Sequence, residues 1–86
     1  MTPIGLLTTA PEAISRRDAR SIEAEIGAIH NRIHTIHRAL NASEEQTVTE
    51  IQTFLRKAQN ALQAGDLDGA HTLTVKARVL LSELQT

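Results

Sequence analysis

Three histidines in one stretch of the chain are the residues with the clearest capacity for chemistry. His30, His34 and His37 are spaced by four and three residues, so a helix would carry all three imidazoles on one face. Imidazole nitrogen is the commonest metal donor in proteins, and two histidines one turn apart can chelate zinc, copper or nickel. The spacing therefore indicates a candidate metal site.

The surroundings of these histidines favour a simpler role. No carboxylate that could orient a ligand imidazole occurs among their neighbours, which are Asn31, Arg32, Thr35 and Arg38. Three interpretations stay open: a metal site, a pH-sensitive interface, and solvated side chains beside an apolar seam, of which we favour the last. His71, which the expected fold places near the level of Ala24, would complete a four-histidine site only with a partner chain.

Other residues with reactive side chains give no catalytic pattern. A charged run, residues 15–20 (SRRDAR), suits a phosphate or a partner, but we favour a solvated helix end. The sequence has no glycine-rich phosphate loop, no carboxylate pair inside an apolar seam and no cysteine. We therefore expect no enzymatic activity and no cofactor.

Composition narrows the class of partner. Nine basic and ten acidic residues give a net charge of -1, so no overall field attracts nucleic acid or anionic lipid. Phe54 is the lone aromatic residue, which leaves no stacking platform for single strands. The chain has neither a signal-peptide pattern at its start nor an apolar run of membrane-spanning length. We expect a protein partner or another copy of the chain, with no nucleic acid and no membrane insertion.

The elements that must position these residues are helices. Thr9 and Glu12 have capping-box spacing, and Pro11 is tolerated in a first helical turn, which predicts a flexible segment over 1–10 and a first helix over about 11–40. Its apolar residues follow an a/d heptad seam with spacings of four, three, four, three and four. They are Ile22, Ile26, Ile29, Ile33, Ile36 and Leu40.

A second helix is predicted over about 44–64. Ser43 and Gln46 have capping-box spacing after a very short connection, so this helix returns antiparallel to the first. Phe54 and Ala61 widen an apolar stripe whose members lie three or four residues apart. They are Val48, Ile51, Leu55, Ala58 and Leu62.

A third helix is predicted over about 67–84. Gly65 suits the left-handed C′ position that ends a helix, and Asp66 can cap the next one. The predicted seam of this helix consists of Ala70, Leu73, Ala77, Leu80 and Leu84. Val75, Val79 and Leu81 lie on other faces, so this helix is either the most buried of the three or carries an interface, and these three residues are its candidate external surface.

Together these elements predict an all-α, up-down-up three-helix bundle with coiled-coil-like heptad packing, as one domain over 11–86. The first helix would be about 45 Å long and the others about 30 Å. The part of the first helix that extends beyond the two shorter helices needs another surface to cover it, and an isoleucine-rich seam favours higher-order coiled coils. We therefore expect a homo-oligomer.

Residues 51–84 resemble a single tetratricopeptide unit. The resemblance depends on an aromatic residue near the start, small residues at two close approaches, and a tight turn: Phe54, Ala58, Ala77 and Gly65-Asp66-Leu67-Asp68-Gly69-Ala70. Ala61 and Thr74 depart from the family, which prefers larger residues there. One unit cannot form the peptide groove of stacked repeats, which usually takes at least three.

Residues 46–84 also look like the terminal helical hairpin of uncharacterised bacterial envelope-associated proteins. That resemblance implies a bacterial structural module, in the envelope or the cytoplasm, and it assigns no site.

We therefore expect a non-catalytic helical module for protein–protein interaction or oligomerisation. Its predicted interface consists of Ile22, Ile26, Ile29, Ile33 and Ile36 as a spine, with Val75, Val79 and Leu81 as the external surface. The alternative is a metal-binding or pH-sensing helical protein that uses His30, His34 and His37.

Overall fold

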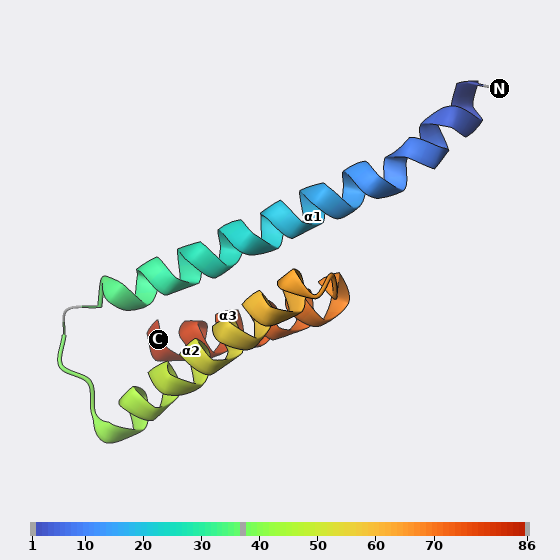
Figure 1. Ribbon diagram of the computed structural model, residues 1–86. Coiled ribbons are helices and arrows are strands. Elements are labelled where there is room, and N and C mark those ends of the chain that lie inside the picture. Colours follow the sequence, from blue (N-terminus) through green and yellow to red (C-terminus); the bar gives the residue numbers. More distant parts are fainter. Residues whose placement is uncertain (1, 37, 86) are drawn as a thin grey trace.

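Three helices account for most of the described part of the chain, and they follow one another in the predicted order. The computed structural model describes the backbone of residues 2–36 and 38–85, and the side chains of residues 18–36 and 38–85. The helices are α1 (Thr2–His34), α2 (Ala42–Gln63) and α3 (Leu67–Gln85). They run up, down and up, with α2 and α3 side by side and α1 across them (Figure 1). The predicted all-α three-helix bundle is confirmed.

A tight turn at Gly65 joins α2 to α3. Gly65 has a φ of +80°, a left-handed conformation that costs glycine little because it has no Cβ. Its N–H donates to the Leu62 carbonyl at 3.0 Å, and the Asp66 N–H donates to the Ala61 carbonyl at 2.8 Å, which is a Schellman ending. Asp66 Oδ1 then accepts from the Gly69 N–H at 2.9 Å and caps α3. Both predictions for this turn are confirmed.

Small residues let α2 and α3 pack closely. Ala58 on α2 and Ala70 and Ala77 on α3 are all 0% exposed, as is the larger Ile51. Thr74 is buried in the same contact, and its hydroxyl donates to the Ala70 carbonyl at 2.7 Å, so the polar group has a partner. The α2–α3 hairpin therefore has a core of its own.

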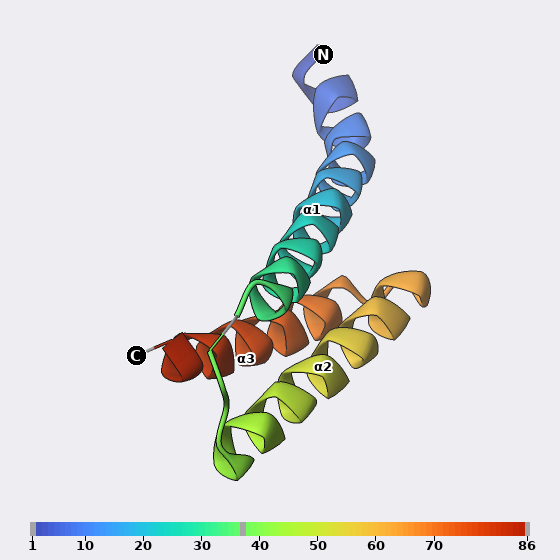
Figure 2. The same cartoon turned by 90° about the vertical axis from the view of Figure 1, so that its left-hand side faces the viewer.

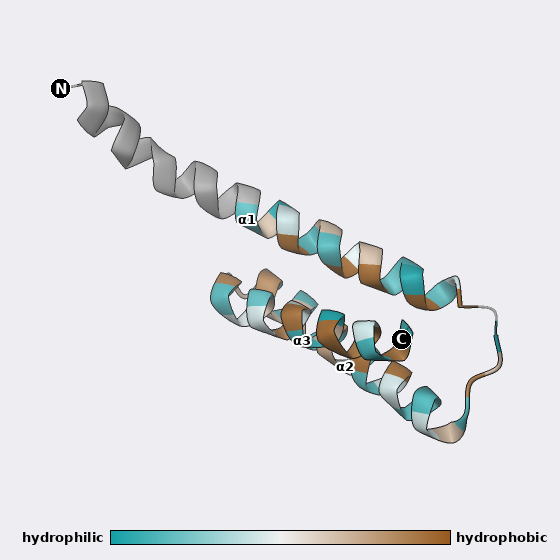
Figure 3. Ribbon diagram, turned by 180° about the vertical axis from the view of Figure 1, so that it is seen from behind, coloured by the Kyte–Doolittle hydropathy of each residue, from teal (hydrophilic) through white to brown (hydrophobic). Residues whose placement is uncertain are grey.

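α1 lies obliquely across this hairpin and contacts it through one apolar stripe (Figure 2). Ile22, Ile26 and Ile29 are buried in the shared core, and in the coloured part of α1 in Figure 3 the hydrophobic residues face the hairpin. Polar contacts also join α1 to α3: Arg78 pairs with Glu25, and Arg32 donates to the Gln85 side chain at 3.2 Å. The first half of the predicted isoleucine seam is thus the inner face of α1.

The connection between α1 and α2 is longer than predicted, because α1 ends at His34 and not near Leu40. The Thr35 hydroxyl donates to the Arg32 carbonyl at 2.9 Å, and the Ile36 N–H bonds to the Ile33 carbonyl at 3.2 Å. These short-range bonds tighten the last turn and replace the next helical bonds. Ile36 and Leu40, both partly buried, therefore belong to the connection.

The cap of α2 is Asn41 and not Ser43. Asn41 Oδ1 accepts from the Glu44 N–H at 2.8 Å, and the Glu44 carboxylate accepts from the Asn41 N–H at 3.0 Å. Both possible boxes have the right spacing and both would place Glu44 in the first turn, so the contact of Arg38 with Glu44 is what favours the Asn41 box. Arg38 donates to Glu44 at 2.8 Å and to the Leu84 carbonyl at 3.1 Å, so it joins the connection to α2 and to the end of α3.

The start of α1 also differs from the prediction. α1 begins at Thr2, so residues 2–10, expected as a flexible segment, lie in the helix; their side chains are outside the described part. Pro3 then occupies the first turn, the position that the sequence had suggested for Pro11. With 33 residues, against 22 for α2 and 19 for α3, α1 is the longest helix, as predicted.

Candidate functional site

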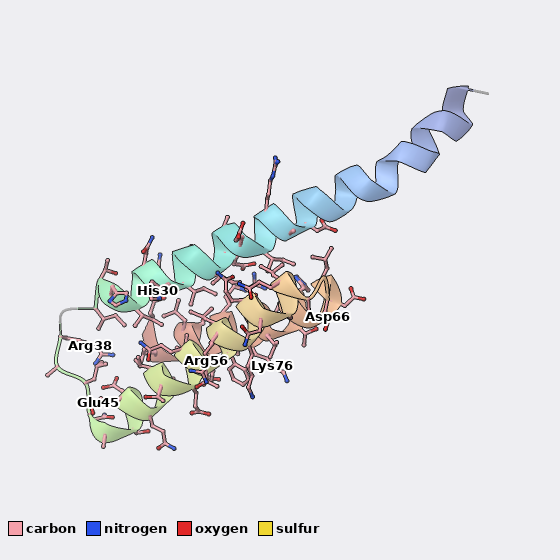
Figure 4. All side chains as sticks on the ribbon, in the orientation of Figure 1. His30, Arg38, Glu45, Arg56, Asp66 and Lys76 are labelled. Atoms are coloured by element: carbon pink, nitrogen blue, oxygen red, sulfur yellow. The ribbon has the colours of Figure 1, made fainter. Side chains whose placement is uncertain are left out.

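A shallow groove between α2 and α3 leaves apolar side chains uncovered in the described part of the chain. It is lined only by residues of these two helices: Glu50, Phe54, Val75, Lys76, Val79 and Leu80. We call it the α2–α3 groove. Val79 is 50% exposed and is the one large hydrophobic residue with such exposure among those described. Figure 4 shows Lys76 on the side of the hairpin away from α1.

Helical spacing builds this groove from both sides. Val75 and Val79 lie one turn apart on α3, as do Glu50 and Phe54 on α2. The Lys76 ammonium lies 5.8 Å from the centre of the Phe54 ring, within cation–π range, and so links the two helices across the groove. The groove thus has an apolar floor, an acidic residue on α2 and a basic residue on α3.

Most of the isoleucines of the predicted interface spine pack against other residues of the same chain. Ile22, Ile26 and Ile29 are buried against the hairpin, and Ile33 and Ile36 are partly buried against the same core. These side chains stabilise the monomeric fold, and their burial leaves them little surface for a partner. Of the predicted external residues, Val79 is exposed and Val75 is half-buried, and both line the α2–α3 groove.

Leu81 was expected on the external surface, but it is only 6% exposed. It lies four residues after Ala77, on the face of α3 that carries the buried residues Ala70, Ala77 and Leu84. Because α3 is apolar over a wide arc, the sequence pattern placed Leu73 and Leu80 in the predicted core. Both residues are only partly buried. Leu80 instead lines the groove, together with Phe54, and the prediction did not include either residue in the external surface.

Two of the three clustered histidines come together at the end of α1. His30 and His34 are exposed, their ring centroids are 4.4 Å apart, and their Nε2 atoms are 3.1 Å apart. Figure 4 shows His30 on the last turns of α1. His37 lies outside the described residues. We refer to His30 and His34 as the histidine pair.

The other titratable candidates stay apart from this pair. His71 is exposed and lies at the level of Ile22 and Glu25, close to the predicted level of Ala24. Among the described residues, no three histidine, cysteine or carboxylate side chains gather closely enough to enclose a metal ion. Of the charged run, Asp18 and Arg20 are exposed, and the side chains of residues 15–17 lie outside the described part.

The described part of the chain also lacks a buried acid or base. Thr74 is its only buried polar residue. At the surface, hydrogen bonds from the Arg38 guanidinium and then from the Asn41 N–H lower the pKa of the Glu44 carboxyl. That effect belongs to the cap of α2, so it stabilises a helix start.

Comparison with other proteins assigns the chain to no family. None of the described helices is both long enough and apolar enough to span a membrane. No family model, no curated protein and no solved structure matches the chain.

Proposed function

We propose that this chain is a non-catalytic helical interaction module that associates with a second copy of itself through the α2–α3 groove. The observation that carries the proposal is the exposure of Val79 in an apolar groove that no described side chain of α1 lines. Exposed apolar surface with a polar rim is typical of protein contact sites. The partly buried ring of Phe54 supplies an aromatic anchor of the kind that dominates such contacts.

The charges at the groove favour a second copy as the occupant. In a two-fold symmetric contact each residue of one chain meets the other chain's equivalent patch, so the patch must complement itself. Glu50 and Lys76 lie on opposite helices at the groove, so a rotated copy can place each of its charges beside an opposite one. An all-acidic or all-basic rim would repel such a copy.

Two further observations support a binding role without catalysis. General acid–base and nucleophilic catalysis use partly desolvated titratable groups, and the described residues include no buried one. We also propose that the α2–α3 hairpin is a single tetratricopeptide-like unit, because the small residues Ala58, Ala70 and Ala77 are fully buried where α2 and α3 meet. Such units are usually stacked, and here α1 covers one side of the hairpin while no described side chain of α1 lines the α2–α3 groove, so the groove face is left to be covered.

The test is the mass of the chain in solution over a concentration series from about 1 to 200 μM, a range in which micromolar affinities are resolved. Light scattering should give a mass above the 9.4 kDa of one chain as concentration rises. Val79→Glu places a charge in the groove and should weaken association at least about tenfold. Gln52→Glu adds the same charge to an exposed position of α2 outside the groove, and it should associate like the wild type.

A charge exchange tests the orientation of the contact. Glu50→Lys and Lys76→Glu should each weaken association, and the double variant should recover part of it, because the opposite charges are restored across the interface. Far-UV circular dichroism of each variant checks that the helices are intact. A monomeric wild type throughout the series, or a Val79→Glu variant that associates normally, would contradict the proposal.

A further inference from the structure

The histidine pair has a geometry that the self-association proposal does not use. His30 and His34 lie one turn apart in the last two turns of α1, and their Nε2 atoms face each other at 3.1 Å. The rings meet edge to face, with an interplanar angle of 69°. In this contact one ring donates an N–H to the lone pair of the other, so the two metal-binding atoms already converge on one small volume.

The separation of these atoms fits a metal ion. A zinc-type ion lies about 2.0–2.1 Å from a histidine nitrogen, and at that length two nitrogens 3.1 Å apart subtend about 98° at the metal. Cis ligands of a square-planar or octahedral ion subtend about 90°, and tetrahedral ligands about 109°. The observed separation lies between these limits, so it suits either geometry once both exposed rings rotate to direct their Nε2 lone pairs at the metal.

We propose that His30 and His34 chelate a divalent transition metal ion, Cu²⁺, Ni²⁺ or Zn²⁺, through their Nε2 atoms. The ring that donates its Nε2–H moves that proton to Nδ1, so both Nε2 atoms present lone pairs and the metal takes the place of the shared proton. Two neutral imidazoles then bind one ion without net loss of a proton. No third histidine, cysteine or carboxylate side chain of the described residues lies close enough to join the pair.

The chelate would act on the end of the helix that carries it. A metal bridging two residues one turn apart requires a helical backbone between them, and α1 ends at His34 itself. Metal binding therefore opposes fraying of the last turn of α1, next to the residue 35–41 connection. Because only the folded helix end holds the two nitrogens in place, the metal should raise the thermal stability of the chain.

The experiment is calorimetric titration of the full, untagged chain with CuSO₄, NiCl₂ and ZnCl₂ at about pH 7.5, where imidazole is mostly neutral. One ion should bind per chain, with Cu²⁺ bound most tightly, as the usual order of stability for nitrogen sites requires.

Variants then locate the site. His30→Gln and His34→Gln each remove one donor and should weaken binding at least about tenfold. His71→Gln is the matched control, since it removes an exposed histidine on α3, and it should leave binding unchanged. Both pair members are exposed, so circular dichroism should show normal helix content in every variant.

The proposal is overturned by any of three results. The first is no binding at about 100 μM of any of the three ions, a concentration at which a weak two-ligand site would still fill. The second is binding that survives in either pair variant, which would place the metal elsewhere. The third is binding lost in His71→Gln. Because the histidine pair lies outside the α2–α3 groove, none of these results bears on self-association.

Discussion

Replacement of Ile29 by alanine measures how firmly α1 is held to the hairpin. Ile29 is 3% exposed and lies beside Leu81, at a shallow surface depression between α1 and α3. Alanine removes three carbons, and at about 0.8 kcal/mol for each buried methylene the transfer term alone is about 2.4 kcal/mol. Because the depression lets neighbours and water fill part of the space, the cavity term should be small, so we expect a loss of about 2–3 kcal/mol.

Ile51 gives the matched comparison within the hairpin. It is 0% exposed and enclosed between the helices, so Ile51→Ala should leave a larger cavity and cost about 3–5 kcal/mol. His30→Gln is the surface control, because it changes the residue next to Ile29 and should alter stability by no more than about 0.5 kcal/mol.

The assay is urea denaturation followed by far-UV circular dichroism, at one fixed protein concentration for all variants. A stability of about 4–13 kcal/mol is ordinary for a chain of this size, so the loss for Ile29→Ala is measurable throughout this range, whereas at its lower end Ile51→Ala would unfold the chain outright. If Ile29→Ala costs less than about 1 kcal/mol while Ile51→Ala costs its full amount, α1 is not docked through the isoleucine stripe and the reasoning is refuted.

Two further predictions concern the turns. Gly65→Val should lower the free energy of unfolding by about 1 kcal/mol or more, because a β-branched residue is strained at a φ of +80°; a thermal melt equal to that of the wild type would contradict this. The stabilisation from the Glu44 carboxylate should be complete above its unfolded pKa of about 4.3, and it should disappear as the pH falls through the lower folded pKa. Urea denaturation from pH 7 to 2.5 should therefore show a stability difference between the wild type and Glu44→Gln that narrows below about pH 4, and a pH-independent difference would be evidence against an ionised cap.

The sequence predicted those features for which a single residue type was decisive. Gly65 is the clearest case, because a left-handed helix ending strongly prefers glycine. The cap of α2 was ambiguous, because Asn41–Glu44 and Ser43–Gln46 have the same spacing and only Arg38, brought near by the fold, distinguishes them. The end of α1 was predicted too late for a similar reason, since the isoleucine spacing continues beyond the residue where short-range bonds close the helix.

The candidate sites were less predictable than the fold. α3 is apolar on several faces, so its sequence alone did not separate the buried Leu81 from the groove residue Leu80. Spacing placed His30 and His34 on one face, but the 3.1 Å approach of their Nε2 atoms depends on side-chain rotamers that spacing leaves free. The α2–α3 groove needed the tertiary fold, because its two sides come from different helices.

The unequal contacts of the three helices also suggest an order of events during folding. The α2–α3 hairpin closes through a turn at residues 64–66, so its buried contacts are near in sequence and cost little loop-closure entropy. α1 must close the longer connection at residues 35–41 before its isoleucines reach the same core. We therefore expect the hairpin to belong to the folding nucleus and α1 to dock late, so that truncations in the isoleucine stripe should accelerate unfolding and leave the folding rate nearly unchanged.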